Sequence, residues 1–233
     1  IRSISAGLKT WTTFGADANA DYVYSPGRVT HGELGKTDGS RHETHFAGTF
    51  LDNEILGLTA AAASAALRAC GFSPDHVAAA AKDFEQLPHR MQRVAEVGGV
   101  EFVDNSKATN VAALFAALKM CNRPVRLIAG GRPKETDFSL VKELLATKGV
   151  MVYLIGESSL ALASAWRDVV KCKLCETLAA AVESAWRDSI RGETVLLAPG
   201  CTSFDQFKNF EDRGEQFSKI VKSFVGKEKE KSG

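Results

Sequence analysis

The second half of this 233-residue chain alternates short apolar runs with helical segments, and this pattern limits the fold more than any other feature. Near-continuous apolar strands joined by helices are typical of a parallel sheet that helices cover on both faces. The sequence therefore predicts a Rossmann-like α/β domain over residues 88–226, with a doubly wound, mostly parallel sheet. The strand-like runs begin near residues 101, 125, 150 and 194, and helices are predicted at 110–120, 138–147, 159–169, 177–190 and up to about 225.

Residues 1–87 follow a different pattern, in which short β-prone segments come first and helices come second. The segments over 12–50 are separated by turn-forming PG, GK and DG dipeptides. An alanine-rich helix is predicted at 55–70, and a second begins after Ser73, an N-cap followed by proline, and runs to about residue 86. We expect the end of a separate β-plus-helix domain here, and a charged, disordered tail at 227–233.

The bulk properties exclude two classes of partner. The chain is 45% hydrophobic and 24% charged, and its formal net charge is +1, so no overall field attracts nucleic acid or an anionic membrane. No run reaches the about 18 apolar residues of a membrane-spanning helix. The opening, IRSISAGLKTWTTFG, has neither a signal core nor an initiating methionine. We therefore expect a cytoplasmic chain that begins inside a longer protein.

The cysteines indicate reduced thiols. Five cysteines, an odd number spread along the chain, fit a reducing compartment better than a disulfide framework. Cys172 and Cys175 form a CxxC pattern, but no second pair or nearby histidine completes a zinc site. A redox role for this pair is the less favoured alternative.

Polar loops follow several of the predicted strands. In open α/β sheets, ligands bind beyond the carboxyl ends of the strands, so the loops at 104–110, 130–137, 156–158 and 199–203 are the candidates. Two of them carry Lys107 and Lys134, and together they add hydroxyls and close-approach glycines. Two ammonium groups on one edge favour a dicarboxylate, or a phosphate with a carboxylate. The alternative is that the lysines are solvated and the polar residues cap helices.

Four segments in this region carry a resemblance to a known family. They resemble motifs of the Mur ligases of peptidoglycan synthesis, most closely the D-glutamate-adding branch, in order and in spacing over about residues 88–225. Two of the segments are DNSKATN at 104–110 and residues 198–211 followed by Arg213-Gly214. SKATN in the first and SFDQFKNFE with Arg213-Gly214 in the second are together the most specific. The other two are LPHR at 87–90, and Gly130-Gly131 with Lys134 and Asp137-Phe138.

The resemblance implies a peptide synthase that forms an amide bond at the expense of ATP, with Mg2+. In this family the carboxylate of UDP-N-acetylmuramoyl-L-alanine attacks the γ-phosphate of ATP to give an acyl phosphate. The amine of D-glutamate then displaces phosphate. The implied partners are these small molecules, with no nucleic acid and no membrane, and the implied state is a monomer. Residues 1–87 would be the C-terminal part of the central ATPase domain.

Site residues are carried over position by position from the resemblance. The nucleotide would be contacted by His89, Arg90, Asp104, Asn105 and Lys107, and Lys107 would also be the catalytic residue at the reacting phosphate. D-Glutamate would be held by Thr109, Lys134, Thr202, Ser203, Phe204 and Phe210. No metal ligand is expected among them, because the family's magnesium ligands would lie mainly upstream.

The chain departs from the family pattern in three places. The family commonly has Asn-Asp before the serine, whereas this chain has Asp104-Asn105. The family's His-Asn-x-x-Asn opening of the alanine-rich helix is not matched at 52–59. Nothing resembles the UDP-sugar domain or the P-loop half of the central domain, with its carboxylated lysine. We therefore expect the chain alone to be inactive.

Two short patterns suggest sites that their context does not support. GELGKT at 32–37 looks like a phosphate loop, but TDGSRHETH follows it instead of an apolar helix. A hairpin turn explains it better. His42 and His45 in HETH fit alternating strand positions better than a metal-binding helix.

Two alternatives to the D-glutamate-adding branch remain. One is another Mur-type or folylpolyglutamate-type ligase, which is disfavoured because the chain has no Asp-Asn-Pro-Arg and has SKATN where a His-Asn-Pro pattern would stand. The other is a non-catalytic anion-binding module that reuses the fold.

Overall fold

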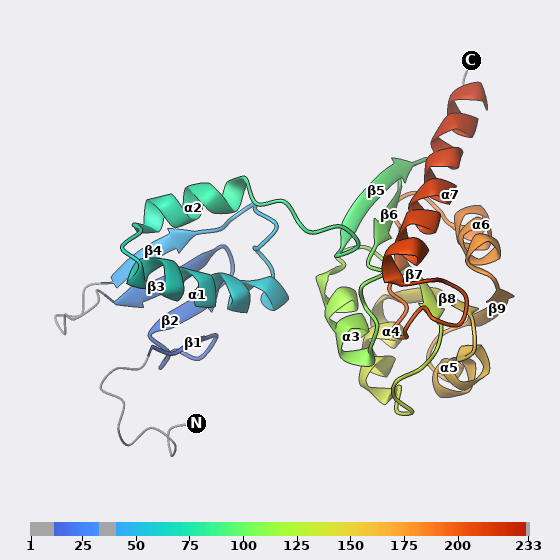
Figure 1. Ribbon diagram of the computed structural model, residues 1–233, viewed down its shortest axis with the longest axis horizontal. Helices are drawn as coiled ribbons and strands as arrows, with labels where there is room; N and C mark the ends of the chain where they lie inside the picture. Colours follow the sequence, from blue (N-terminus) through green and yellow to red (C-terminus); the bar gives the residue numbers. More distant parts are fainter. Residues whose placement is uncertain (1–11, 33–40, 232–233) are drawn as a thin grey trace. The chain divides into compact units, whose positions relative to one another are not determined.

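The computed structural model describes residues 12–32 and 41–231, with side chains as far as residue 225 (Figure 1). The chain divides into two compact units, Ile1–Glu85 and Gln86–Gly233. This division falls two residues before the predicted boundary. Among the described residues, no helix combines the length and the apolar character needed to cross a membrane.

Unit 1 is a small sheet packed against two helices. Its core includes Tyr24 and Val29 of the sheet and Ala60 and Ala61 of the first helix. Gly57 packs directly against the Tyr24 ring. A Cβ at residue 57 would lie 2.2 Å from that ring, so no larger residue fits without a shift. The strands, in spatial order, are β1 (Phe14–Gly15), β2 (Tyr22–Ser25), β3 (Arg28–Gly32) and β4 (Arg41–His45), and the helices are α1 (Glu54–Ala69) and α2 (Pro74–Lys82).

Of the two doubtful patterns of the first unit, one lies on a strand and the other falls almost entirely outside the described residues. His42 and His45 lie on β4, as predicted. Because they are three residues apart on a strand, their side chains point to opposite faces of the sheet. Residues 33–37 of GELGKT lie outside the described residues. Asn53, at the mismatched opening of the alanine-rich helix, caps α1 by accepting from the amides of Ile55 and Leu56.

Unit 2 is a three-layer domain with six strands in its sheet (Figure 1). The strand order is β5-β6-β10-β7-β8-β9, and every neighbouring pair is parallel except β5 with β6. The strands are β5 (Gln92–Val97), β6 (Val100–Asp104), β7 (Val125–Gly130), β8 (Gly149–Ile155), β9 (Cys172–Glu176) and β10 (Thr194–Leu197). The helices are α3 (Val111–Met120), α4 (Lys142–Lys148), preceded by a 3-10 turn at Ser139–Val141, α5 (Ser159–Trp166), α6 (Leu178–Asp188) and α7 (Phe210–Lys231).

Helices cover both faces of this sheet, which confirms the predicted fold class. Residues of α3, α4 and α5, such as Leu114, Leu145 and Trp166, pack on one face. Residues of α6 and α7, such as Val182 and Phe217, pack on the other. The four predicted strands β6, β7, β8 and β10 form the centre, where both faces are buried and the apolar runs are continuous.

Unit 2 differs from the prediction in its two outer strands and in the end of its last helix. β5 and β9, which were not predicted, are the outer strands of the sheet. β5 joins β6 through Gly98-Gly99, a hairpin signal that was present in the sequence. α7 continues to Lys231, into the segment predicted as a disordered tail.

The CxxC pattern is a strand pattern. Cys172 and Cys175 both lie on β9, and a separation of three residues directs their side chains to opposite faces of the sheet. Cys172 accordingly packs against one core and Cys175 belongs to the other. All five cysteines are free thiols.

A buried ion pair joins β7 to the segment before β10. The Nε of Arg126 lies 2.6 Å from Oε2 of Glu193, and Nη1 lies 3.0 Å from the Tyr153 hydroxyl. Arg126 is 8% exposed and Glu193 is 5% exposed. Because both charges are almost fully buried, each depends on the other.

Replacing Arg126 with methionine should lower the free energy of unfolding by about 3–5 kcal/mol, because Glu193 would stay buried without its partner. Urea unfolding of unit 2, followed by tryptophan fluorescence, measures the change. The double variant Arg126→Met/Glu193→Gln should recover most of the loss. Lys142→Met, which breaks the exposed pair with Asp168, should cost at most about 1 kcal/mol. Equal losses in the two single variants would contradict the prediction.

Candidate functional site

The candidate loops meet at one edge of the sheet because of the strand order. β10 lies between β6 and β7 and is parallel to both, so the carboxyl ends of all three strands reach the same edge. The loops that begin there contain Lys107, Lys134 and Ser203. The predicted placement of both lysines on one edge is therefore confirmed.

Backbone hydrogen bonds join these loops to one another. Arg132 and Thr202 exchange two backbone hydrogen bonds of 3.0 and 2.9 Å, and the Thr202 hydroxyl also donates to the Arg132 carbonyl. The amide of Gly200 donates to the Ala108 carbonyl, in the loop after β6, over 2.9 Å. At Gly131, φ is +133° and a Cβ would lie 2.2 Å from the Thr202 carbonyl oxygen, so only glycine fits. The loops thus form one connected rim.

The reversed pair Asp104-Asn105 directs its two side chains to different partners. Asp104 is fully buried, and its Oδ2 lies 2.7 Å from Nδ1 of His89 while its Oδ1 accepts the amide of Ser106. Asn105 is 8% exposed, and its Oδ1 accepts the amide of Met91. Both Asp104 oxygens are therefore occupied within the protein, and a direct contact of Asp104 with nucleotide stays a prediction.

The Phe210 ring contacts both Lys107 and His89. The Lys107 ammonium lies 3.8 Å from the centroid of this ring, which is a cation–π contact. The His89 ring meets the same ring edge-on, with centroids 6.2 Å apart and planes at 81°. Two residues predicted to contact nucleotide and one predicted to hold D-glutamate are therefore in contact in one cluster.

Arg213 on α7 is the main residue of this site for which no role was predicted from the sequence. Its guanidinium is fully buried, and it donates to the Ser106 hydroxyl, the Ser106 carbonyl and the Cys201 carbonyl over 2.9, 2.8 and 3.2 Å. Burial lowers the pKa of Arg213 to about 10. Its place in the RG pair after SFDQFKNFE was the available signal. Through these hydrogen bonds Arg213 connects α7 to the loop after β6 and to the loop after β10.

The remaining predicted residues differ in exposure. Ser203 is 2% exposed and Thr202 is 7% exposed, so both belong to the buried part of the rim. Thr109 is half-buried. Lys134 and Arg90 are exposed, and Phe204 is 62% exposed. These three side chains are free of the core and are accessible from solvent.

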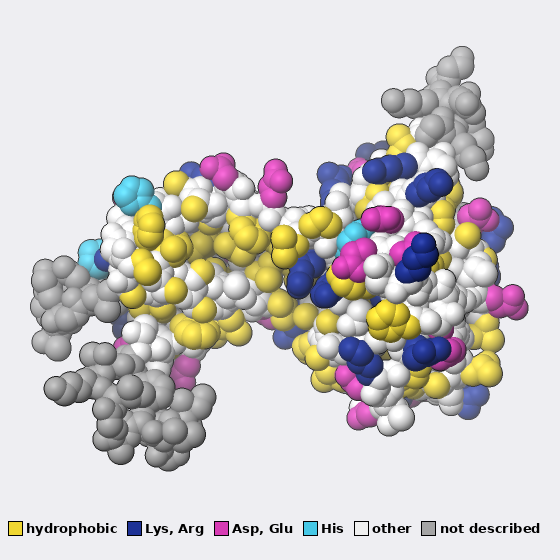
Figure 2. Space-filling view, viewed as in Figure 1, with side chains coloured by type: hydrophobic (Ala, Val, Ile, Leu, Met, Phe, Trp, Pro, Cys, Tyr) yellow, Lys and Arg dark blue, Asp and Glu magenta, His cyan; other side chains and the backbone are white. Residues whose placement is uncertain are grey.

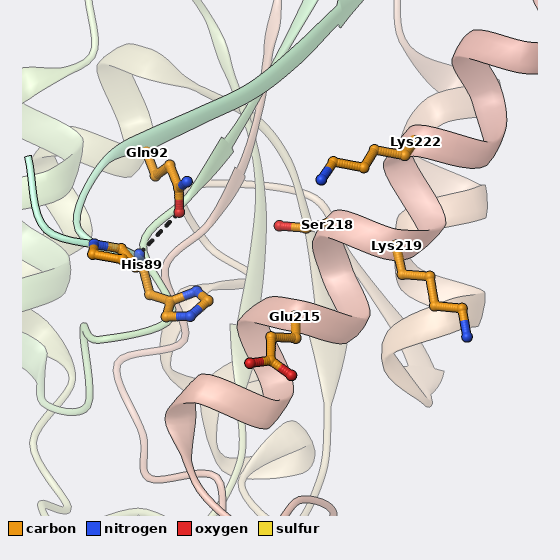
Figure 3. Close-up of a pocket in the computed structure, with 7 residues that line it drawn as sticks. His89, Gln92, Glu215, Ser218, Lys219 and Lys222 are labelled. Atoms are coloured by element: carbon orange, nitrogen blue, oxygen red, sulfur yellow. Dashed lines mark hydrogen bonds between the residues drawn. The ribbon is translucent and has the colours of Figure 1, made fainter.

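A cavity of about 420 Å3 opens beside His89, against α7. Gln92 accepts the backbone amide of His89, and Ser218 and Lys222 point from α7 toward Gln92 while Glu215 points toward His89 (Figure 3). Figure 2 shows basic and acidic side chains interleaved over this face of α7. The sequence motifs did not include these helix residues. The cavity is lined by Pro88, His89, Gln92, Glu215, Ser218, Lys219 and Lys222.

Gly214 leaves the space that the histidine–aspartate pair occupies. A Cβ at residue 214 would lie 2.2 Å from His89 Nδ1 and 2.7 Å from Asp104 Oδ2. Gly214→Ala should therefore cost about 1–3 kcal/mol, the usual range for overpacking a filled interior. Thermal unfolding of the variant measures this loss. Ser223→Ala, at an exposed position of the same helix, is the control, and equal melting temperatures in the two variants would refute the close packing.

Residues 89–201 match a known protein family, which is described as Mur ligase, glutamate ligase domain. The UDP-N-acetylmuramoylalanine–D-glutamate ligase of Desulfatibacillum aliphaticivorans is 44% identical over 138 residues, covering 59% of this chain and 31% of the relative. The ligase of the same name from Myxococcus xanthus is 42% identical over 164 residues, covering 70% of this chain and 36% of the relative. The chain thus spans about a third of the length of these relatives.

A solved structure supports the fold. The UDP-N-acetylmuramate–alanine ligase of Thermotoga maritima superposes with a TM-score of 0.61 and 14% sequence identity, covering 91% of this chain and 48% of that chain. At this identity the likeness concerns the fold alone. It agrees with the mostly parallel, helix-covered sheet of unit 2.

Proposed function

We propose that this chain, whose residues 89–201 match the Mur ligase family and whose relatives named above are D-glutamate ligases at 42–44% identity, is part of a ligase that adds D-glutamate to UDP-N-acetylmuramoyl-L-alanine at the expense of ATP. The chain would supply the C-terminal domain and the last part of the central ATPase domain. One observation carries this proposal. The loops with Lys107, Lys134 and Ser203 begin on the same edge of one parallel sheet, where an anionic amino acid can be held between them.

The proposed reaction has two steps. The L-alanyl carboxylate attacks the γ-phosphate of ATP, so that a carboxyl oxygen–phosphorus bond forms and ADP leaves. The D-glutamate amine then attacks the acyl carbon, loses a proton, and phosphate leaves as the amide forms. Both steps develop negative charge on oxygen, and fixed cations nearby stabilise such charge.

The site residues would divide these tasks between the two ligands. Lys107, whose ammonium is fixed over the Phe210 ring, would neutralise the phosphate oxygens. Lys134, Thr109 and Ser203 would bind the carboxylates of D-glutamate and orient its amine. Such charge-assisted hydrogen bonds are worth roughly 1.5–3 kcal/mol each. The cation–π contact would keep Lys107 in place before ligand binds.

The magnesium that the family uses does not fit the residues described. No group of three or more His, Cys, Asp or Glu side chains in the described part of the chain could hold a metal ion. Its ligands, like the phosphate loop, would have to come from other parts of a full-length ligase. No step above is therefore assigned to the metal.

D-Glutamate should bind this chain more tightly than L-glutamate, because hydroxyl and ammonium groups on a rigid rim distinguish the two arrangements of carboxylates and amine. Titration calorimetry of both enantiomers measures the preference. Lys134→Ala should weaken D-glutamate binding at least about tenfold, the loss of one charge-assisted hydrogen bond. Lys171→Ala, an exposed lysine just before β9, is the control. Equal binding of the enantiomers, lost together in Lys134→Ala, would favour a non-catalytic anion-binding module.

The 233-residue chain alone should not ligate its substrates. It spans about a third of the length of the relatives named above, and neither metal ligands nor a phosphate loop is present among the residues described. An assay of ADP release with ATP, Mg2+, UDP-N-acetylmuramoyl-L-alanine and D-glutamate tests this. Turnover that depends on all of the substrates would overturn the expectation.

A further inference from the structure

Asp104 is a buried charge whose surroundings define the state of His89. Its carboxylate can only accept hydrogen bonds, so the 2.7 Å contact requires that His89 Nδ1 carries the hydrogen and donates. The second carboxylate oxygen accepts the Ser106 amide over 2.8 Å. The imidazole of His89 is thus held in one tautomer and one orientation, with Nε2 as its other nitrogen.

The backbone of His89 is fixed as firmly as its ring. The backbone of His89 is in the left-handed region, with φ at +61°. Residues other than glycine rarely adopt this conformation. Its amide donates to Gln92 Oε1 over 3.1 Å, and its carbonyl accepts the amide of Lys107 over 3.2 Å. Gly214 leaves space against the ring, because a Cβ there would lie 2.2 Å from Nδ1. The ring therefore has little room to move.

The fixed His89 ring in turn restricts the position of the Phe210 ring. The His89 ring contacts it edge-on at 6.2 Å, and the Ser106 hydroxyl donates to the Phe210 carbonyl over 2.7 Å. The Lys107 ammonium lies 3.8 Å from the centroid of the same ring. Lys107 has a flexible stem that can adopt many rotamers, so the ring decides where its charge rests.

We infer that Asp104 is a positioning residue, whose carboxylate acts through His89 to hold the Phe210 ring on which the Lys107 ammonium rests. Its value to catalysis rests on the function proposed above, because Lys107 is the group assigned to the phosphate. Asp104 would then determine the position of the Lys107 ammonium through the rings of His89 and Phe210, without contacting the ligand itself. The adjacent Asn105 contacts the backbone at Met91 instead.

Nuclear magnetic resonance of the 233-residue chain tests this inference without any ligand. In the unmodified chain, the Lys107 ε-methylene protons should be shifted upfield by the ring current of Phe210, and the imidazole nitrogens of His89 should report hydrogen on Nδ1 when the ring is neutral. Asp104→Ala should move the Lys107 protons to the values of a solvated lysine and release the His89 tautomer. Asp137→Ala, an exposed loop carboxylate that accepts the Ser139 amide, is the control and should change neither signal.

Asp104→Asn separates orientation from charge. An asparagine at residue 104 can keep the Ser106 contact through its oxygen and donate its Nδ2 hydrogen to His89 Nδ1. The Lys107 shift should therefore persist while the His89 hydrogen moves from Nδ1 to Nε2. Loss of the Lys107 shift with no change of tautomer would overturn the proposed route through His89.

A second variant covers the case in which Asp104→Ala does not fold. Asp104→Asn/His89→Asn removes the imidazole without leaving a buried charge, and asparagine tolerates the left-handed backbone. The Lys107 shift should be lost in this variant, and its retention would refute the inference. D-Glutamate and ADP titrations of the same proteins keep the two proposals apart. If the signals behave as described but neither ligand binds, the inference stands and the proposed function fails.

Discussion

The parallel insertion of β10 between β6 and β7 is the interaction on which the candidate site depends. Each of the four residues of β10 pairs with both neighbours, so that Leu197 stands between Asp104 and Ile128. This register brings the loop with Lys107, the loop with Lys134 and the loop with Ser203 to one edge. A shift of one residue in either ladder would move the loops apart and turn their side chains to the other face.

Buried charges then fix the loops that the sheet has brought together. Arg213 satisfies carbonyl groups of two loops from a helix that begins after the last of them, and Asp104 satisfies His89 and Ser106. A buried charge is costly unless its hydrogen bonds are made, so each of these residues favours the single arrangement that supplies its partners. Lys107, which is half-buried, and Lys134, which is exposed, thus stand on a rim whose interior is rigid. Rigidity of this kind is what an oriented reaction needs.

The sequence predicted the centre of the fold and the edge that carries the site, but not the contacts inside it. β6, β7, β8 and β10 were predictable because burial on both faces leaves a continuous apolar run. β9 was not, because an outer strand such as CKLCE carries charged side chains and resembles a loop. The loop motifs pointed to Lys107 and Lys134. The contact of His89 with Asp104, and the need for Gly214 beside it, depend on the register of β6 and on the packing of α7, which no local pattern records.

The strand order also has a consequence for the way in which the domain is made. In chain order, β6, β7, β8 and β9 all come before β10. Residues 194–197 of β10 can therefore take their place in the middle of the sheet only after these strands have been synthesised. Until then β6 and β7 each present an unpaired edge, which is the kind of surface that other chains can join. During synthesis on a ribosome, this domain would therefore stay vulnerable to misassembly until about three quarters of unit 2 has emerged, and a chaperone that shields strand edges would act best in that interval.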